Sequence, residues 1–267
     1  MELNRRRKEA IQLEEKRLEG IKGLEDYPTL HERHRIFPAV FENRRHKRII
    51  DVAAGMGVVG KRIKDLYPTE LMCNDISPTC LKCLQNLGIR TTSFDIDDDQ
   101  NPFPFPDGDF DGIIALAIIE HLIHIDHFLR EIHRILCNDV YLYISAPNYS
   151  GLPYLLPFLL SGKTFHDPIS ETSRYEFYAH LRYFTYTTLL EFVGSFEFTP
   201  EAVYLALPEG SSRYQDLKSK SKLKALSFRN LMKLLYKLFS PRWAAEPVIC
   251  FRKGLSTPNR TLRKVML

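Results

Sequence analysis

Short apolar runs alternate with stretches of helical spacing along most of the chain. The run at residues 112–119 contains no polar side chain and follows turn residues, which is typical of a strand buried on both faces. Runs of this kind predict strands at residues 49–52, 70–75, 91–96, 112–119, 140–145, 198–207 and 247–253. Strands that alternate with helices form parallel sheets. The pattern therefore predicts an α/β fold with a doubly wound, mostly parallel, Rossmann-like sheet of seven strands.

The predicted sheet divides the chain into four parts. Residues 1–45 read as a helical N-terminal extension rich in Arg, Lys, Glu and Leu, and residues 46–148 as the ligand-binding core. Residues 149–184 are an aromatic-rich insertion after the fifth strand, on the side of the sheet where ligands bind. Residues 185–267 complete the sheet.

The net charge of +4 is unevenly distributed. Residues 1–48 hold 13 Lys and Arg against 9 Asp and Glu, residues 49–200 hold 10 against 20, and residues 201–267 hold 14 against 4. The acidic middle lacks the clustered cations that phosphate contacts need, which argues against a nucleic-acid partner. The oligomeric state is left open.

Composition and cysteine usage indicate an ordinary globular protein, with 44% hydrophobic and 26% charged residues among 267. Five scattered cysteines predict no disulfide framework and a reducing compartment. The charged N-terminus has no apolar core of signal type, and the longest apolar stretch, Gly151–Leu160, is short and contains two prolines. We expect a cytoplasmic protein without a membrane span.

The segment Leu217–Phe239 combines lysines with leucines at helical spacing, which predicts one or two basic amphipathic helices. We favour the interpretation that the leucines of this segment pack on the sheet and its lysines face the solvent. The alternative is peripheral contact with an anionic membrane, such as the inner membrane face, with Trp243 at the interface.

The stretch from Ile49 to Gly57, IIDVAAGMG, reads as a strand that runs into a tight turn and then a helix. Glycines permit positive φ, and the first N–H groups of the helix point toward the same space. Gly55-x-Gly57-x-x-Gly60 satisfies the dinucleotide fingerprint, with Asp75 placed to bind a ribose. A turn for S-adenosylmethionine (SAM) is the other interpretation. Asp51 favours SAM, because a carboxylate at the strand end repels a pyrophosphate but attracts an ammonium and a sulfonium.

Polar side chains recur where the predicted strands end, namely at Asp51, Asp75, Asp95, His121 and Asn148. The carboxyl ends of parallel strands meet at one edge of the sheet, so these side chains are expected near one ligand site. Residues 97–99 are three consecutive acids, which is typical of a solvated loop. Cys80 and Cys83 have no matching second pair of cysteines, so we expect them to pack within a helix and not to bind a metal. We predict no metal site.

Several motifs together resemble the class I SAM-dependent methyltransferases, in particular the group that acts on small molecules. IIDVAAGMG resembles the first motif, with Ala53 where a glycine is usual, and CNDIS and SFDID resemble the ribose and adenine segments. FPFPDGDFDGIIALAIIEHL resembles the fourth-strand motif, and HLRYFTYTTLLEFV a later segment. The resemblance covers roughly residues 45–200.

The resemblance implies SAM as cofactor and assigns it a set of residues. Asp51, Ala53, Gly55 and Gly57 would lie along the methionine part, Asp75 would bind the ribose and Ile76 the adenine, Asp95 and Ile96 would contact the adenine, and Leu116 and Ala117 would line the methyl group.

Catalysis by this chemistry needs a base only if the acceptor must lose a proton. His121 and His180 are the candidate bases by residue type and position. A purely structural role for each of them is an equally good interpretation. The Asn/Asp-Pro-Pro-aromatic signature is absent after the fourth strand, which disfavours DNA-adenine and protein-glutamine methylation. We expect methyl transfer to oxygen or carbon of a small-molecule or a lipid- or glycan-linked acceptor. The alternatives are an NAD-dependent oxidoreductase and a non-catalytic, partner-binding subunit.

Overall fold

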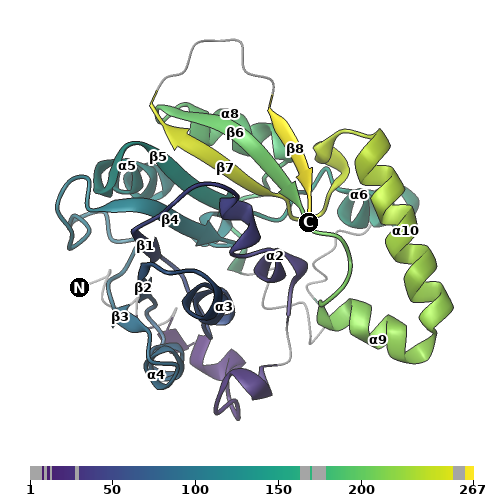
Figure 1. Cartoon of the computed structure of the whole chain (residues 1–267), viewed down its shortest axis with the longest axis horizontal. Coiled ribbons are helices and arrows are strands. Elements are labelled where there is room, and N and C mark those ends of the chain that lie inside the picture. Colours follow the sequence, from purple (N-terminus) through teal and green to yellow (C-terminus); the bar gives the residue numbers. More distant parts are fainter. Residues whose placement is uncertain are drawn as a thin grey trace.

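The computed structural model describes residues 8, 11, 12, 14–27, 30–162, 169, 179–254 and 262–267. A sheet of eight strands forms the centre of the molecule, in the order β3-β2-β1-β4-β5-β7-β6-β8 (Figure 1). The strands are β1 Arg48–Asp51, β2 Glu70–Asn74, β3 Arg90–Thr92, β4 Phe110–Leu116, β5 Leu136–Ser145, β6 Phe198–Leu205, β7 Val248–Lys253 and β8 Arg263–Met266.

The seven predicted strands are all present, and the prediction of seven was wrong by one. β1 to β5 pair in parallel, β7 is antiparallel to both β5 and β6, and the additional β8 pairs in parallel with β6. The sequence of β8, RKVM, has too few apolar residues to read as a strand. β8 forms a strand because its backbone pairs with β6, and the sequence pattern does not reveal this pairing.

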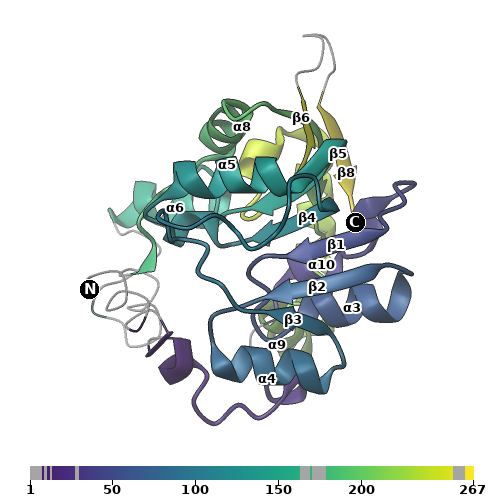
Figure 2. The same ribbon diagram turned by 90° about the vertical axis from the view of Figure 1, so that its left-hand side faces the viewer.

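Helices cover both faces of the sheet (Figures 1 and 2). The apolar side chains of α3 pack on one face, together with the aromatic core around Phe37 and Tyr143, and those of α5 and α8 pack on the other. The helices are α2 Glu32–Arg35, α3 Val58–Leu66, α4 Pro78–Asn86, α5 Ile125–Ile135, α6 Leu152–Ser161, α8 Tyr186–Gly194, α9 Ser212–Lys220 and α10 Lys222–Leu238. Four single turns of 3-10 helix are η1 Leu24–Asp26, η2 Ala39–Phe41, η3 Ile119–His121 and η4 Pro241–Trp243.

Side-chain caps mark the starts of α4 and α8. Ser77 accepts a hydrogen bond from the Cys80 N–H at 3.1 Å, with Pro78 in the first turn of α4. Thr185 and Thr188 form a reciprocal capping box at the start of α8. Both caps follow segments at the ligand edge, so they fix where those segments turn.

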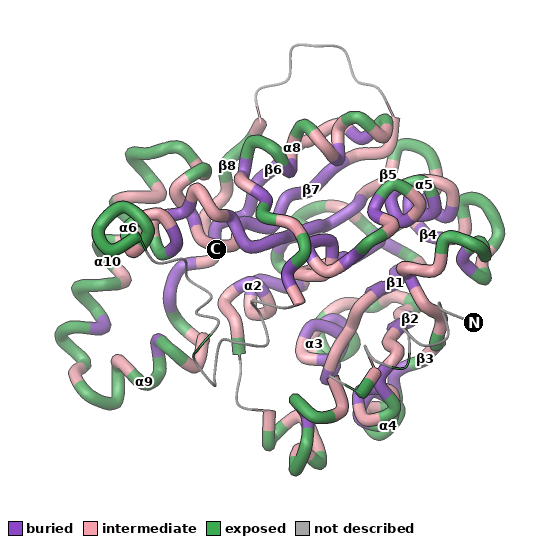
Figure 3. Tube along the Cα trace, turned by 180° about the vertical axis from the view of Figure 1, so that it is seen from behind, coloured by how far each residue is buried: buried purple, intermediate pink, exposed green. Residues whose placement is uncertain are grey.

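The basic segment forms two helices, α9 and α10, which separate at Ser221. Our favoured interpretation of its leucines was wrong: α10 packs mainly on α9, Ala225 is its one buried residue, and most of its leucines face outward (Figure 3). The periodicity identifies an apolar stripe but does not say what covers it.

Within the described ranges, no helix combines the length and the apolar character that crossing a bilayer requires. Part of the predicted aromatic insertion, including Phe165, Tyr175, Phe177 and Tyr178, lies outside the described residues. The described part consists of α6 and the segment that follows Ala179, which returns to the ligand edge of the sheet.

Candidate functional site

The glycine turn after β1 is open to a ligand. Gly55 has a φ of +52°, and a side chain added there would meet no atom within 4 Å. Gly57, with a φ of +83°, is the N-cap of α3. Both glycines use a left-handed backbone that side chains disfavour. The turn therefore brings bare backbone and the start of a helix to the carboxyl edge of the sheet.

Asp75 follows β2 and ties this turn to the next one. Its carboxylate accepts hydrogen bonds from the Gly55 N–H at 2.8 Å and from the Ser77 N–H at 2.9 Å. Burial raises the pKa of Asp75 to about 6, against the opposing effect of these bonds. A carboxylate can accept about four hydrogen bonds, so Asp75 retains capacity for ligand hydroxyls.

Asp51, the last residue of β1, is 3% exposed. Burial raises the pKa of Asp51 to about 7, and the nearby charge of Asp75 adds to the rise. Within the described part of the chain, the one hydrogen bond to its carboxyl is long, 3.4 Å from the Ala53 N–H. A buried carboxyl with so little compensation favours a cationic ligand, which would stabilise its ionised form.

The side chain of Asn74 holds three of these turns together, and the sequence analysis missed it. Its amide group donates to the carbonyls of Val52 at 3.0 Å and Phe94 at 3.2 Å, and its oxygen accepts from the Phe94 N–H at 3.0 Å. Val52 follows Asp51 and Phe94 precedes Asp95. One buried amide therefore sets the spacing of the three predicted acidic positions, and an Asn at a strand end just before an acid is the only sequence signal of it.

The other predicted cofactor residues lie at the same edge. Asp95 accepts from the Asp97 N–H at 3.0 Å in the loop after β3, and Ile96 is buried beside it. Leu116 ends β4, and Ala117 has a φ of +49°, unusual for a residue with a side chain. Strained backbone of this kind clusters at functional sites, and here it turns the chain into η3.

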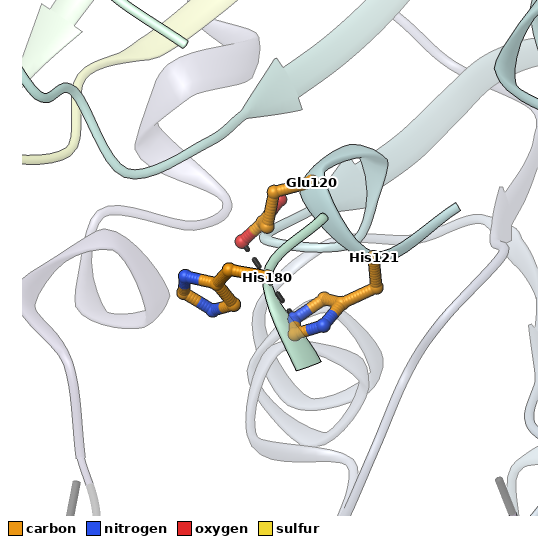
Figure 4. Close-up of side chains that lie close together, drawn as sticks. All are labelled: Glu120, His121 and His180. Atoms are coloured by element: carbon orange, nitrogen blue, oxygen red, sulfur yellow. Dashed lines mark ion pairs between the residues drawn. The ribbon is translucent and has the colours of Figure 1, made fainter. Parts of the chain in front are cut away.

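His121 and His180, far apart in sequence, meet beyond the end of β4, with ring centroids 4.7 Å apart (Figure 4). The His121 Nδ1 donates to the Ala179 carbonyl at 3.0 Å, and its Nε2 lies 3.9 Å from the Glu120 carboxyl. The His180 Nδ1 is 3.0 Å from the Tyr149 hydroxyl. Glu120, which the sequence analysis did not single out, is 1% exposed, and burial raises its pKa to about 8.

Asn148, also at a strand end, has a structural role. Its oxygen accepts from the Tyr186 N–H at 2.8 Å, and its nitrogen donates to the carbonyls of Arg242 and Ala244 at 2.8 and 2.6 Å. The side chain is 2% exposed and its amide is engaged by these bonds, so it holds the loops after β5 and before β7 together.

The N-terminal extension covers the flank of the glycine turn. Leu18 packs with Met56, Cys80 and Cys83 in a small apolar cluster. The Glu15 carboxylate accepts from the Ser77 and Thr79 hydroxyls at 2.5 and 2.7 Å, at the N-terminus of α4. The cysteine pair therefore packs as predicted, and residues 15–18 close one side of the site.

A family model described as a methyltransferase domain matches residues 50–144, which span β1 to β5 and the acidic turns. This part of the chain is similar to methyltransferase domains. Ajmaline N-methyltransferase of Rauvolfia serpentina is 31% identical over 97 residues, 34% of this chain and 33% of that protein. Malonyl-acyl-carrier-protein O-methyltransferase of Geobacter sulfurreducens is 28% identical over 125 residues, 45% of this chain and 47% of that protein. The chain thus spans a third to a half of the length of these curated relatives.

Two solved SAM-dependent methyltransferase structures share the fold of this chain. A SAM-dependent methyltransferase of Thermotoga maritima superposes with a TM-score of 0.55 at 13% identity, over 84% of this chain and 89% of that one. A SAM-dependent methyltransferase of Archaeoglobus fulgidus superposes with a TM-score of 0.53 at 17% identity, over 82% of this chain and 91% of that one.

SAM is the cofactor of such a domain, and the site fits it. Asp51 is a buried, poorly compensated carboxyl that a cation would stabilise, Asp75 has unused acceptor capacity, and Gly55 leaves open space beside both. A ligand with an ammonium, a sulfonium and ribose hydroxyls matches these three features.

Replacing Asn74 with Ala should destabilise the protein and weaken SAM binding together. The substitution leaves two buried carbonyls and one N–H without their partner, at about 1 kcal/mol each, so unfolding should become easier by roughly 2–4 kcal/mol. Denaturant unfolding and calorimetric SAM titration measure the two effects. Asn86→Ala, on the exposed end of α4, is the matched control and should change neither. Equal stabilities of the two variants would contradict the role of Asn74.

Replacing Asp51 with Asn should remove the main pH dependence of SAM binding. Wild-type affinity should rise from about pH 5.5 to about pH 8, because the cation needs the ionised carboxylate and the pKa of Asp51 is about 7. The variant should bind about tenfold more weakly at high pH and keep only the smaller dependence that Asp75 contributes.

The stability of the ligand-free protein should change in the opposite sense. A raised folded-state pKa means that wild type loses stability as pH rises from about 4 through about 7, whereas the Asn variant does not lose this contribution. Thermal unfolding should therefore show the variant as the more stable protein at about pH 8. Parallel pH profiles for the two proteins would refute the assignment.

Proposed function

We propose that this chain transfers the methyl group of SAM to an oxygen of a small-molecule or lipid-linked acceptor. Support comes from the position of the Glu120, His121 and His180 side chains, just beyond the end of β4 and next to the strained Ala117. In open α/β sheets, ligands bind beyond the carboxyl ends of the strands, so an acceptor would meet these groups.

In this proposal the cofactor lies across the turns after β1, β2 and β3. Asp51 would bind the ammonium group, with the backbone of Gly55 and Gly57 beside it. Asp75 would accept from the ribose hydroxyls, and Ile76 and Ile96 would pack near the adenine, whose amino group would donate to Asp95. Leu116 and Ala117 would face the reacting centre. When bound, SAM supplies a methyl group that is already activated by its positive sulfur.

The acceptor atom follows from the need to remove a proton. A neutral amine attacks with a lone pair that it already holds, but a hydroxyl or a carbon acid must lose a proton during the reaction. His121 holds its proton on Nδ1 because it donates to Ala179, so Nε2 is the basic nitrogen. An amine acceptor would not need two imidazoles and a carboxyl to remove a proton. These groups therefore favour oxygen as the atom that is methylated, with carbon as the second candidate. The relatives named above include both an N- and an O-methyltransferase.

The two alternatives from the sequence have less support. The dinucleotide interpretation requires a pyrophosphate next to Asp51, a buried carboxyl that would repel it. Asp75 suits a ribose under either interpretation. A non-catalytic subunit would have no need for the Glu120 and histidine cluster beside the cofactor edge.

Incubating the full chain with methyl-labelled SAM and a cell extract, then separating lipid, small-molecule, RNA and protein fractions, tests the proposal. Label should enter the lipid or small-molecule fraction as a base-stable methyl ether or a base-labile methyl ester. Asp75→Ala should abolish both SAM binding and transfer. His180→Ala should bind SAM normally and transfer about a hundredfold more slowly or worse.

His133→Ala is the control, since this histidine lies on α5 and its nearest charged partner is Glu197. It should transfer at the wild-type rate. Label in RNA or protein, or NADH binding in place of SAM binding, would overturn the proposal. SAM binding without transfer to any fraction would favour the non-catalytic alternative.

A further inference from the structure

Three potential metal ligands converge beyond the end of β4. Glu120, His121 and His180 each place one ligand atom within 4.8 Å of the other two (Figure 4). Glu120 and His121 lie on η3, and His180 lies on the segment that returns after α6. A carboxylate and two imidazoles are the protein ligands of many catalytic transition-metal sites.

The Glu120 carboxyl is the strongest sign that something is bound here. It is 1% exposed, and among the described residues neither of its oxygens has a hydrogen-bond partner. The nearby cation Arg33 is already paired with Glu246. Buried polar groups in native proteins almost always have partners, and an orphaned carboxyl is a common mark of an absent ion.

The histidines are oriented as metal ligands usually are. The Nδ1 of His121 donates to the Ala179 carbonyl, and the Nδ1 of His180 contacts the Tyr149 hydroxyl. A metal-bound histidine typically uses its second ring nitrogen in this way, which fixes the ring and its tautomer. Nε2 is then the nitrogen that each ring would offer to a cation.

Hydrogen bonds between the two segments preset this geometry. The Leu181 and Arg182 N–H groups donate to the Glu120 carbonyl at 2.9 and 3.2 Å. The Arg182 guanidinium also donates to the carbonyls of Leu122 and Ile123. The three ligands therefore stand on a rigid support, as a specific site requires.

We propose that Glu120, His121 and His180 bind a divalent transition-metal cation that also takes the acceptor oxygen as a ligand. The role of the acceptor rests on the function proposed above. A cation-bound hydroxyl loses its proton to water more easily, after which its oxygen forms the new bond to the methyl carbon as the sulfur–carbon bond breaks. No electron is gained or lost by the cation. In this arrangement the histidines would bind the cation and would not act as bases. The cation would activate the hydroxyl.

Titration of the chelator-treated full chain with Co²⁺ and Zn²⁺ alone tests the site without any substrate. We expect one equivalent to bind, visible as Co²⁺ absorption bands and as a higher temperature of unfolding with Zn²⁺. His180→Ala and Glu120→Gln should each weaken binding at least tenfold. Glu120→Gln is close to the protonated acid in shape and charge, so it should fold, and His180→Ala serves if it does not. His133→Ala should bind as wild type does.

The outcomes separate the cation from the proposed function. Stoichiometric binding that the two variants lose supports the site. Binding that they retain, or no binding, overturns it, and methyl transfer that persists in chelator would then leave the histidines as bases. Cation binding without transfer to any fraction would leave the site standing and overturn the proposed function.

A second, independent surface is the outward face of α10. Leu223, Leu231, Leu234 and Leu238 share one side of the helix and are 51% to 74% exposed. The opposite side, at Ala225, faces the protein. An exposed apolar stripe of this length is unusual on a monomeric protein and marks an interaction surface.

The polar residues that flank this stripe are all basic or neutral. α10 carries Lys222, Lys224, Arg229, Lys233 and Lys237 and no acid. α6, at the same end of the molecule in Figure 1, exposes Leu156, Phe158, Leu159 and Leu160 and has no charged residue. In a symmetric dimer through this stripe, like charges would face each other. Anionic lipid headgroups would instead neutralise the lysines while the leucines enter the acyl boundary.

We infer that α10 lies on the surface of an anionic membrane. This surface would bring the proposed active site to lipid-linked acceptors, but binding itself does not depend on that function. Each lysine near the surface contributes about 1 kcal/mol, so Lys233→Ala and Lys237→Ala should each weaken partitioning about fivefold. Salt should weaken it further.

Sedimentation of the full chain with phosphatidylcholine vesicles, with and without about one third phosphatidylserine, measures this. We expect binding to the anionic vesicles only, and its loss in Leu231→Glu/Leu234→Glu. Leu66→Glu, an exposed leucine on α3, is the control and should bind normally. Equal binding to both vesicle types, or no binding, would overturn the inference, as would concentration-dependent dimers that Leu231→Glu/Leu234→Glu abolishes.

Discussion

The hydrogen bonds of the Asn74 amide are the constraint on which the cofactor side of the site depends. The carbonyl of Val52 and both backbone groups of Phe94 bind one side chain, so the turns after β1 and β3 take their positions from the end of β2. The Asp75 carboxylate extends the same arrangement to Gly55. Only an amide both donates and accepts in this way, so neither Asp nor Leu could replace it in this buried position. The spacing of the three acids is thus set by a residue that need not touch the ligand.

The acceptor side depends on a different kind of support. There, the N–H groups of residues 181 and 182 donate to the carbonyl of Glu120, and the Arg182 guanidinium donates to the carbonyls of Leu122 and Ile123. Segments on either side of β5 and α6 are joined in this way. The cofactor side is built from consecutive strand ends, whereas the acceptor side needs a tertiary contact. This difference explains why the two halves were predictable to different degrees.

The sequence predicted the core and the cofactor turns because their signals are local. Apolar runs and the acids that follow the strands each identify their own position. β8 was missed because its strand character comes from pairing with β6, and the orientation of α10 because periodicity does not reveal a covering surface. His121 and His180 were named separately, but their meeting with Glu120 depends on contacts between distant segments, which spacing along the chain does not encode.

Buried acids with raised pKa values connect the two halves of the site. Asp51, Asp75 and Glu120 all lie at one edge of the sheet, and burial raises the pKa of each to about 7, 6 and 8. The ionised form of each carboxyl would be more stable in water than in this buried position. Ionisation therefore destabilises the ligand-free protein, and a cationic ligand would offset this cost. Such an edge suits a positively charged ligand better than a pyrophosphate, although its glycine turn would accept either. The charge of these acids, more than the glycine spacing, decides what this fold binds.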